Sequence, residues 1–304
     1  MKAFKNQISP CYVYIFCALF AGMEFIKILP TPELASYIHF FWFYEGETGV
    51  ILKDRTFPDG SIEIVFNLGT TVQRSTNAGG YSVNPEVEVM GQIIHPYSVK
   101  CQGLNKFLGV RFFPHTFSCF SKIPHDAFVD QAVEARELLG NEFRNVAREI
   151  QDAERPIDKL PLLEQFFLKK LSSLHINEKK YSILAFSVKH INQNVNARPL
   201  DEIMSRTGVN ARYLQRLFLQ NVGISPKCFI KIDRFQRSLQ LLRDPSSNLT
   251  EIALECGYFD QAHFNHDFKS FTGMTPSAYL NDDFPINKYF LSEERNLLTE
   301  NKEC

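Results

Sequence analysis

The chain has 304 residues, 44% of them apolar and 22% charged, and a formal net charge of −1. At roughly 100–200 residues per domain this length suggests two domains, and the composition excludes an intrinsically disordered protein. The near-neutral total also excludes a uniformly basic nucleic-acid-binding protein, so any basic surface must be local.

The first 22 residues form a segment apart, in which Lys2 and Lys5 precede an apolar run from Cys11 to Met23. At about 13 residues this run is too short to span a bilayer, which takes about 20. We assign residues 1–22 to an N-terminal extension with three open interpretations: sequence upstream of a true start at Met23, a signal or anchor segment, or a structured part of the protein. We expect no membrane partner.

Residues 34–120 are predicted to form several short strands. Tyr37–Tyr44 is rich in aromatic residues, and Phe57–Gly60 contains the Pro-Asp-Gly order of a tight turn. Ser61–Asn67 alternates in a way that predicts one buried side, with Glu63 on the other side facing solvent. Short strands with turns between them favour a barrel or a sandwich. Further strands are expected at Glu86–Ile94 and Phe107–Phe113.

The pattern then becomes helical. Gln131–Ile150 and Lys159–Leu174 are predicted helices, with Pro156 and Pro161 marking breaks. They either support dimerisation or pack onto the strands in front of them, since both roles explain the same pattern. Residues 175–180 suit a linker, and an all-helical region follows as far as about residue 280.

Residues 198–243 form a basic block inside this near-neutral chain. They contain nine Lys or Arg and three acidic residues, a local net charge of +6. Such a block is the electrostatic footprint of a phosphate-binding surface, although a solvated helix face can have the same composition. The seven cysteines are scattered without a CxxC pair, which favours a reducing compartment and a cytoplasmic protein.

A self-similarity of about 50 residues lies within 200–276. The motif Leu-Asp-Glu-Ile at 200–203 returns as Leu-Thr-Glu-Ile at 249–252, and further matched positions follow in the same order. They are Gly208 and Gly257, Leu214 and Phe264, Phe218 and Phe268, Gly223 and Gly273, and Pro226 and Pro276.

Each copy is predicted to be a helix, a tight turn and a second helix. Gly208 and Gly257 mark the turns, because glycine enters left-handed conformations without a Cβ clash. Asn210 and Asp260 suit the N-caps of the second helices. Each second helix has an apolar stripe opposite a polar one, which is typical of a recognition helix that reads the major groove with Arg, Gln or Asn. An ordinary helical bundle is the alternative.

Between the copies, Cys228–Leu242 is predicted to be a linker helix that holds the two units at a fixed separation. Two recognition helices reach successive major grooves when about 34 Å separates them. Lys227, Lys231 and Arg234 form a basic stripe on another side of this helix. These three residues are candidate phosphate contacts, with a solvated face as the alternative.

At these residues the chain resembles the AraC/XylS family of bacterial transcription regulators, over roughly 181–281. The segments include Arg-Tyr-Leu-Gln-Arg-Leu-Phe (212–218), Ile-Ala-Leu-Glu-Cys-Gly-Tyr-Phe-Asp-Gln-Ala-His-Phe (252–264) and Phe-Lys-Ser-Phe-Thr-Gly-Met-Thr-Pro (268–276). The resemblance implies a two-part DNA-binding domain behind a variable sensor domain. Carried over by position, it implies base contacts from Arg212, Gln215, Arg216, Gln261, Ala262, Asn265 and His266.

The second copy departs from the family pattern, which usually has Arg where His266 stands. Histidine is mostly neutral at pH 7, which weakens a contact with phosphate or guanine. Residues 250–280 also carry four acidic residues against Lys269, a net charge of −3. We therefore expect the first copy to dominate the affinity for DNA.

The front of the chain is similar to a sensor domain of some members, through Phe-Pro-Asp-Gly-Ser-Ile-Glu-Ile-Val-Phe-Asn-Leu-Gly (57–69) and Leu-Gly-Val-Arg-Phe-Phe-Pro (108–114). That resemblance implies a small cupin-like β-barrel. Trp42 and His95 are candidate ligand-binding residues, although a packed aromatic and a loop histidine explain them as well. The histidines at 39, 95, 115 and 125 contain no HxH pair, so we expect no metal and no cofactor.

We therefore expect an α+β two-domain protein: a small cupin-like β-barrel with trailing helices at 23–175, an all-α domain with two helix-turn-helix units joined by a linker helix at 180–281, and a tail at 282–304. The expected function is sequence-specific DNA binding and transcription regulation under a small-molecule or protein signal, without enzymatic activity. The alternative is a cupin-like enzyme fused to a DNA-binding module. Expected partners are double-stranded DNA and a small-molecule effector, with RNA polymerase as a further candidate; monomer and homodimer both stay open.

Overall fold

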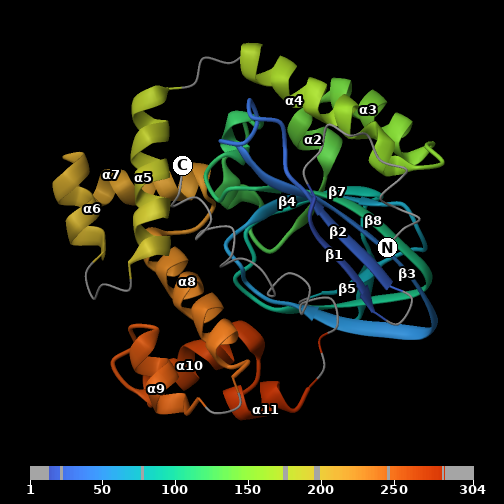
Figure 1. Ribbon diagram of the computed structural model, residues 1–304. Helices are drawn as coiled ribbons and strands as arrows, with labels where there is room; N and C mark the ends of the chain where they lie inside the picture. The colour runs from blue at the N-terminus through green and yellow to red at the C-terminus, as the bar shows by residue number, and fades with distance from the viewer. Residues whose placement is uncertain are drawn as a thin grey trace.

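The chain folds into a sheet region followed by a helical region, as the computed structural model in Figure 1 shows. We use "sheet region" for the described residues up to 173 and "helical region" for those from 177 onward. This division confirms the predicted α+β organisation, whereas the exact domain boundaries stay predictions. The structure describes residues 14–20, 23–76, 79–173, 177–194, 199–244, 247–282 and 284.

All strand pairings in the sheet region are antiparallel, and the main path runs β1-β2-β3-β8-β4-β7-β9, with β5 and β6 beside β8. The long strands β3 and β8 form its centre. The strands are β1 (Tyr14–Phe20), β2 (Met23–Ile28), β3 (Ile38–Thr56), β4 (Ile62–Asn67), β5 (Gln73–Ser75), β6 (Tyr81–Val83), β7 (Val87–Met90), β8 (Tyr97–Phe112) and β9 (Ala132–Glu134).

The expectation of a closed β-barrel is wrong for the part of the chain that the structure describes. Closure requires the first and last strands to pair, but β1 and β9 are the two ends of an open path. The reason lies at β9, which has only three residues before the chain turns into a helix at Ala135. This short strand pairs with β7 alone among the described strands and forms the edge of the sheet.

Both faces of this sheet are buried. On one face Ile62, Ile64 and Phe66 of β4 join the sheet core, where the Phe66 ring lies 6.0 Å from that of Phe143. The opposite face carries a second cluster, whose members are Phe25, Phe40, Trp42, Tyr44 and Val65. The expectation that Glu63 faces solvent is therefore wrong, because Glu63 is only 4% exposed on this second buried face.

The three α-helices α2, α3 and α4 cover the first face of the sheet (Figure 1). The predicted single helix over Gln131–Ile150 is wrong at its start, where Ala132–Glu134 form β9, and the rest is divided because Gly140 adopts a φ of 87°. This conformation is open to glycine and interrupts α-helical hydrogen bonding. The elements are η1 (Phe117–Cys119), η2 (His125–Phe128), α2 (Ala135–Leu139), α3 (Asn141–Gln151), η3 (Pro156–Lys159) and α4 (Leu160–Ser173).

The helical region has its own core, and the predicted turns and caps are confirmed. Gly208 and Gly257 have φ values of 69° and 78°. The side chains of Asn210 and Asp260 accept hydrogen bonds from the backbone N–H groups of Tyr213 (2.9 Å) and His263 (2.7 Å). The helices are α5 (Glu178–Gln193), α6 (Pro199–Thr207), α7 (Ala211–Asn221), α8 (Pro226–Leu241), α9 (Leu249–Glu255), α10 (Gln261–Thr272) and α11 (Pro276–Leu280).

The turn after β3 joins the two regions. Phe57 belongs to the helical core, with its ring 5.7 Å from Tyr279 and 5.1 Å from Phe284. At Gly60, where φ is 78°, an added Cβ would lie 3.1 Å from the Phe229 ring of α8. The Pro-Asp-Gly turn predicted from the sequence is thus an inter-region contact as well as a strand connection. None of the described helices has the length and apolar character needed to cross a membrane.

Candidate nucleic-acid interface and ligand pocket

The helix α7 presents the predicted polar stripe to solvent. Its Leu214, Leu217 and Phe218 are at most 2% exposed. On the opposite side Arg212, Gln215 and Arg216 are all exposed. The Arg216 guanidinium lies 5.2 Å from the ring centre of Tyr213, a contact that holds its long side chain along the helix. All three candidate base-contacting residues of the first copy therefore share one accessible side.

The helix α10 presents a less basic and less accessible stripe. Ala262 and His266 are exposed, whereas Gln261 and Asn265 are half-buried. The side-chain oxygen of Gln261 accepts a hydrogen bond from the Thr250 hydroxyl at 2.9 Å, so this residue is held against α9. The four candidates of the second copy lie on one helix, but two of them are partly covered.

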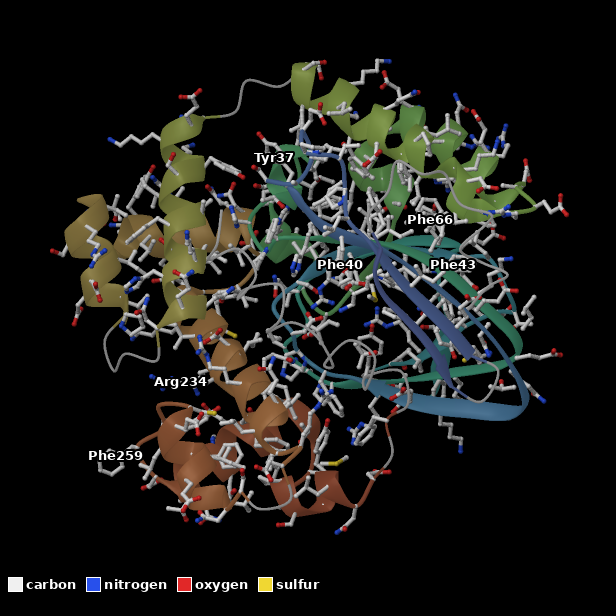
Figure 2. All side chains as sticks on the ribbon, in the orientation of Figure 1. Tyr37, Phe40, Phe43, Phe66, Arg234 and Phe259 are labelled. Carbon is white, nitrogen blue, oxygen red and sulfur yellow. The ribbon has the colours of Figure 1, made fainter. Side chains whose placement is uncertain are left out.

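An exposed aromatic residue that the sequence reasoning missed stands beside this stripe. Phe259 is 87% exposed in the turn between α9 and α10, two residues before Gln261 (Figure 2). Phenylalanine is most often buried, and Phe259 is the most exposed large apolar side chain among the described residues. The available signal was its position outside the 3–4 residue spacing of the apolar stripe, which runs through Phe264 and Phe268.

The three candidate phosphate contacts have different surroundings. Lys227 is exposed. The ammonium of Lys231 forms an ion pair with Asp267 of α10 at 2.9 Å, and Asp267 is only 2% exposed. The Arg234 guanidinium is half-buried and lies 5.9 Å from the Tyr258 ring. Lys231 and Arg234 thus connect α8 to the second helix pair, and Lys227 has the most accessible charge of the three.

A cavity of about 150 Å³ lies on the second face of the sheet. Its walls include Phe25, Trp42, Tyr44, Tyr97 and Phe107, so aromatic rings dominate them. The β3–β8 register places Trp42 opposite Gly109, where any Cβ would overlap the indole ring. Glycine at 109 is therefore what allows the large Trp42 ring to lie flat on the sheet beside the cavity.

The structure separates the two residues that the sequence singled out for ligand binding. Trp42 lines the cavity. His95 does not line it: its side chain is 70% exposed, and its Nδ1 lies 2.7 Å from the Asp130 carboxylate. The sequence could not exclude His95, because its distance from Trp42 in space depends on the loop between β7 and β8.

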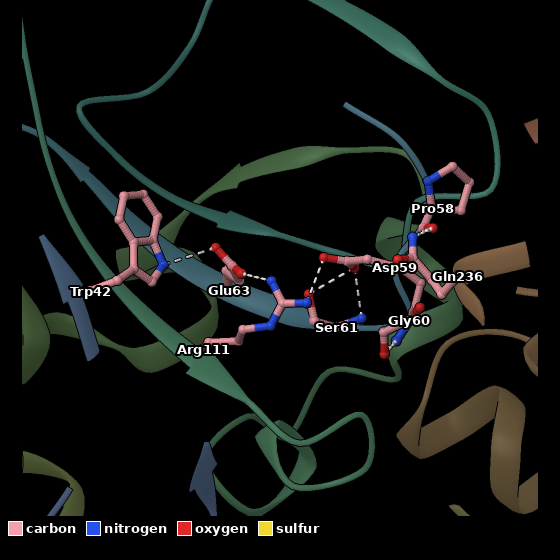
Figure 3. Close-up of polar contacts among 9 residues, drawn as sticks. Trp42, Pro58, Asp59, Gly60, Ser61, Glu63, Arg111 and Gln236 are labelled. Atoms are coloured by element: carbon pink, nitrogen blue, oxygen red, sulfur yellow. Dashed lines mark hydrogen bonds and ion pairs between the residues drawn. The ribbon is translucent and has the colours of Figure 1, made fainter. Parts of the chain in front are cut away.

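A buried charged network reaches from the cavity to the turn after β3 (Figure 3). Arg111 donates to Glu63 at 2.5 Å and to Asp59 at 2.8 Å. Glu63 also accepts a hydrogen bond from the Trp42 indole N–H at 3.2 Å. Burial raises the pKa of Glu63 to about 6, although the Arg111 charge opposes the rise. Both terminal nitrogens of the Arg111 guanidinium, Nη1 and Nη2, therefore donate to carboxylates.

A second buried carboxylate, Glu88, lies in the cavity wall. One of its oxygens accepts a hydrogen bond from the Asn84 amide at 3.0 Å. The other oxygen, Oε2, is buried without a hydrogen-bond partner among the described residues. Burial raises the pKa of Glu88 to about 7, against the smaller effects of Asn84 and Arg74. A buried acceptor without a donor lowers the stability of the fold, so this carboxylate favours a ligand that donates a hydrogen bond.

The helix α8 closes one side of the cavity. Gln236 and Leu239 contribute to its wall. The Gln236 amide donates to the carbonyl oxygen of Pro58 at 2.5 Å (Figure 3). The Gln92 amide donates to the carbonyl oxygen of Gly60 at 2.9 Å. The same helix therefore touches the cavity, the turn after β3 and both helix pairs.

No group of three or more His, Cys, Asp or Glu converges in the described part of the chain, and the expectation of no metal stays a prediction. Of the described histidines, His115, His125 and His190 are buried and His39 is half-buried. Burial lowers the pKa of His39 to about 3 and those of His115 and His125 to about 4, so they are neutral at pH 7.

Two protein families match the two regions separately. Residues 203–282 match the family described as "Helix-turn-helix domain", and residues 26–134 match a "Domain of unknown function (DUF6597)". The chain is 27% identical over 118 residues to the Msm operon regulatory protein of Streptococcus mutans, which covers 39% of this chain and 42% of that protein. It is 30% identical over 118 residues to an uncharacterized HTH-type transcriptional regulator of Haemophilus influenzae, with 39% and 37% covered.

The chain thus spans less than half the length of these curated relatives. Among solved structures, ToxT of Vibrio cholerae bound to (E)-4-(8-methylnaphthalen-1-yl)but-3-enoic acid is 14% identical with a TM-score of 0.42, covering 79% of this chain and 97% of that one. The predicted resemblance to AraC/XylS regulators is confirmed for the C-terminal part, which is an AraC-type helix-turn-helix domain.

Proposed function

We propose that this chain, an AraC-type protein by its helix-turn-helix domain, is a transcription regulator that binds DNA at specific sequences and senses a small molecule through its sheet region. The single observation that carries the proposal is the exposed stripe of Arg212, Gln215 and Arg216 on α7, opposite a fully buried apolar stripe. Such a stripe offers bidentate donors to guanine and an amide to adenine in the major groove.

The two helix pairs, α6–α7 and α9–α10, are proposed as two helix-turn-helix units. In this proposal α8 sets their separation, so that α7 and α10 enter successive major grooves about 34 Å apart. Lys227 supplies a phosphate contact, while Lys231 and Arg234 hold the second unit in place. The sheet region is proposed as a cupin-like sensor, with an open sheet in place of a closed barrel.

Sensing is proposed to act through α8, because that helix forms part of the cavity wall and also joins the two units. A ligand that contacts Gln236 or moves the turn at Pro58 changes the position of α8 relative to the sheet. For this to regulate DNA binding, the ligand must bind more tightly to one arrangement of the two regions than to the other. The inter-region hydrogen bond between Gln236 and Pro58 supports this route.

Selection of bound duplexes from a random library, followed by fluorescence anisotropy on the winning sequence, tests the proposal. We expect a preferred site that Arg212→Ala and Arg216→Ala weaken, and an affinity that falls with salt by a slope of about −0.9 per phosphate contacted. Arg148→Ala is the matched control, because Arg148 is an exposed arginine on α3 in the sheet region. A purified protein that prefers no duplex over random competitor contradicts the proposal.

The cellular setting is part of the same proposal. The regulator is proposed to act in the cytoplasm on chromosomal DNA, as a monomer or a homodimer, and to contact RNA polymerase at its promoters. Light scattering of the complex with a selected site distinguishes the two oligomeric states. Transcription in vitro with and without the protein shows whether it affects RNA polymerase.

A further inference from the structure

The chemistry of the cavity defines what kind of molecule it can accept. Four acidic residues, Asp54, Asp59, Glu63 and Glu88, contribute to its wall against two basic ones, Arg55 and Arg111. An excess of carboxylates alone does not make a binding site. Two further features point to a ligand, namely buried acceptors that lack donors and a wall of aromatic rings.

The acceptors without donors belong to two side chains that are hydrogen-bonded to each other, Asn84 and Glu88. The Oε2 atom of Glu88 and the Oδ1 atom of Asn84 are both buried and have no hydrogen-bond partner among the described residues. Glu88 is 6% exposed, and both residues line the cavity. Buried polar atoms in folded proteins are almost always paired. Two neighbouring unpaired acceptors in a cavity therefore call for a ligand that carries hydrogen-bond donors.

Arg111, one of the two basic residues of the cavity wall, is already engaged by carboxylates, and Arg55 reaches toward the end of α10. Arg111 donates to both Glu63 and Asp59. The Arg55 guanidinium lies about 3.0 Å from the point where a Cβ on Gly273 would stand, at the end of α10. An anionic ligand would have to compete with carboxylates that already hold Arg111, and it would meet the Glu88 carboxylate as a like charge.

The aromatic wall complements a cation with an apolar body. Trp42, Tyr44, Tyr97 and Phe107 all line the cavity. The negative face of an aromatic ring attracts ammonium and guanidinium groups, and its area contacts an apolar ligand body. A neutral apolar ligand would fill the same walls but would leave the acceptors of Glu88 and Asn84 unpaired.

We propose that the cavity binds an organic cation, a protonated primary amine or an amidinium with a compact apolar body, whose N–H groups donate to Glu88 and Asn84. This inference rests on the proposed function, because it names the class of effector for the same sensor. The Glu88 carboxylate supplies the counter-charge. Gln236 of α8 lines the cavity, so a bound ligand can change the position of α8.

Binding of three matched probes to the full chain tests the proposal. Benzylammonium, benzyl alcohol and benzoate share one aromatic body and differ in charge. At pH 8 we expect benzylammonium to bind at least about tenfold more tightly than the other two, as for hydrogen bonds to charged groups. Isothermal titration calorimetry measures all three affinities. An affinity for benzylammonium no greater than that for benzyl alcohol, or a preference for benzoate, overturns the proposal.

A charge-removing variant assigns the preference to one carboxylate. Glu88→Gln should lower the affinity for benzylammonium about tenfold and leave that for benzyl alcohol unchanged. Glu86→Gln is the matched control, since Glu86 is exposed two residues earlier in the chain. A loss in the control equal to that in Glu88→Gln contradicts the assignment. If Glu88→Gln does not fold, the wild-type preference should still shrink between pH 8 and 6, as Glu88 takes up its proton; a preference independent of pH overturns the role of Glu88.

The same samples separate this inference from the proposed function. Selected duplex DNA is titrated into each protein with and without benzylammonium. A protein that binds its DNA site but ignores benzylammonium overturns the cation site and leaves the regulator standing. A protein that binds benzylammonium through Glu88 but prefers no duplex overturns the regulator and leaves the cation site standing.

Discussion

The side-chain amide of Gln236 donates a hydrogen bond to the backbone carbonyl oxygen of Pro58, at 2.5 Å and across 178 residues of sequence. Gln236 belongs to the helix between the two helix pairs, and Pro58 belongs to the turn that follows the longest strand of the sheet. Both residues are buried. This one contact ties a cavity in the sheet region to the helix that sets the spacing of the proposed DNA-reading helices.

Replacing Gln236 by Leu should destabilise the protein, because the carbonyl of Pro58 stays buried and loses its donor. The expected cost is about 1–3 kcal/mol in the free energy of unfolding. Urea denaturation followed by the fluorescence of Trp42, the sole tryptophan of the chain, measures it. Gln220→Leu, at an exposed position of α7, should change stability by less than about 0.5 kcal/mol. Equal losses in the two variants would show that the hydrogen bond to Pro58 is not the cause.

Arg216→Ala should weaken DNA binding more than His266→Ala. Arg216 is exposed on α7 and carries a permanent charge, whereas His266 stands where the resemblance to AraC/XylS regulators implies arginine. A bidentate contact to guanine contributes about 1–3 kcal/mol, a tenfold or larger loss in affinity for most of that range. Anisotropy titrations on a selected duplex compare the two variants. Similar losses would refute the dominance of the first helix pair.

Lys227→Ala and Lys231→Ala should differ in what they impair. Lys227 is exposed, so its loss should reduce the salt slope of DNA binding by about 1 without changing stability. Lys231 is paired with Asp267, which is only 2% exposed. Its loss leaves a buried carboxylate without its ion pair and should cost about 1–3 kcal/mol of folding free energy, since the lysine itself is half-exposed. The reverse pattern would assign the phosphate contact to Lys231.

Phe259→Ala should leave the fold intact and weaken DNA binding. The ring is 87% exposed, so its removal should change the free energy of unfolding by less than about 0.5 kcal/mol. Its position just before α10 lets it contact sugars or thymine methyl groups once α10 lies in the groove. Thermal unfolding and anisotropy are measured on the same preparation, with Leu280→Ala, at a 54% exposed residue of α11, as control. An unchanged affinity for DNA would show that Phe259 does not contribute to binding.

His125→Leu should remove part of the acid sensitivity of folding. His125 is 1% exposed, and burial lowers its pKa to about 4 from an ordinary value of 6.5. Between these two pH values the unfolded chain binds a proton that the folded chain does not, so stability falls as the pH decreases. The slope from this one group is at most about 1.4 kcal/mol per pH unit.

Urea midpoints at pH 7, 6 and 5 measure that slope. In His125→Leu the decline should be shallower than in the wild type. His95→Gln serves as control, because the His95 side chain is 70% exposed and outside the core. Parallel declines in wild type and His125→Leu would mean that His125 does not contribute to the acid sensitivity.

Local chemistry in the sequence was enough to predict much of the helical region. Gly208 and Asn210 have effects that act within a few residues: a positive φ that glycine tolerates, and a side chain that caps the next helix. The apolar stripe of α7 is likewise set by helical spacing alone. These elements and the family of the C-terminal domain could therefore be recognised without coordinates. The base-contacting roles of the exposed residues stay predictions.

The tertiary structure decided whether each side of a strand or helix meets solvent, a cavity or another element. Alternation along β4 showed that Glu63 lies opposite Ile62 and Ile64, but it could not show that the second face is also covered. Residues distant from β4 in the sequence bury that face, among them Trp42, Arg111 and Gln236 of α8. For the same reason the sequence alone could neither separate Trp42 from His95 nor show that the sheet stays open. Periodicity reports the side of an element, whereas long-range packing determines whether that side meets solvent, a cavity or another helix.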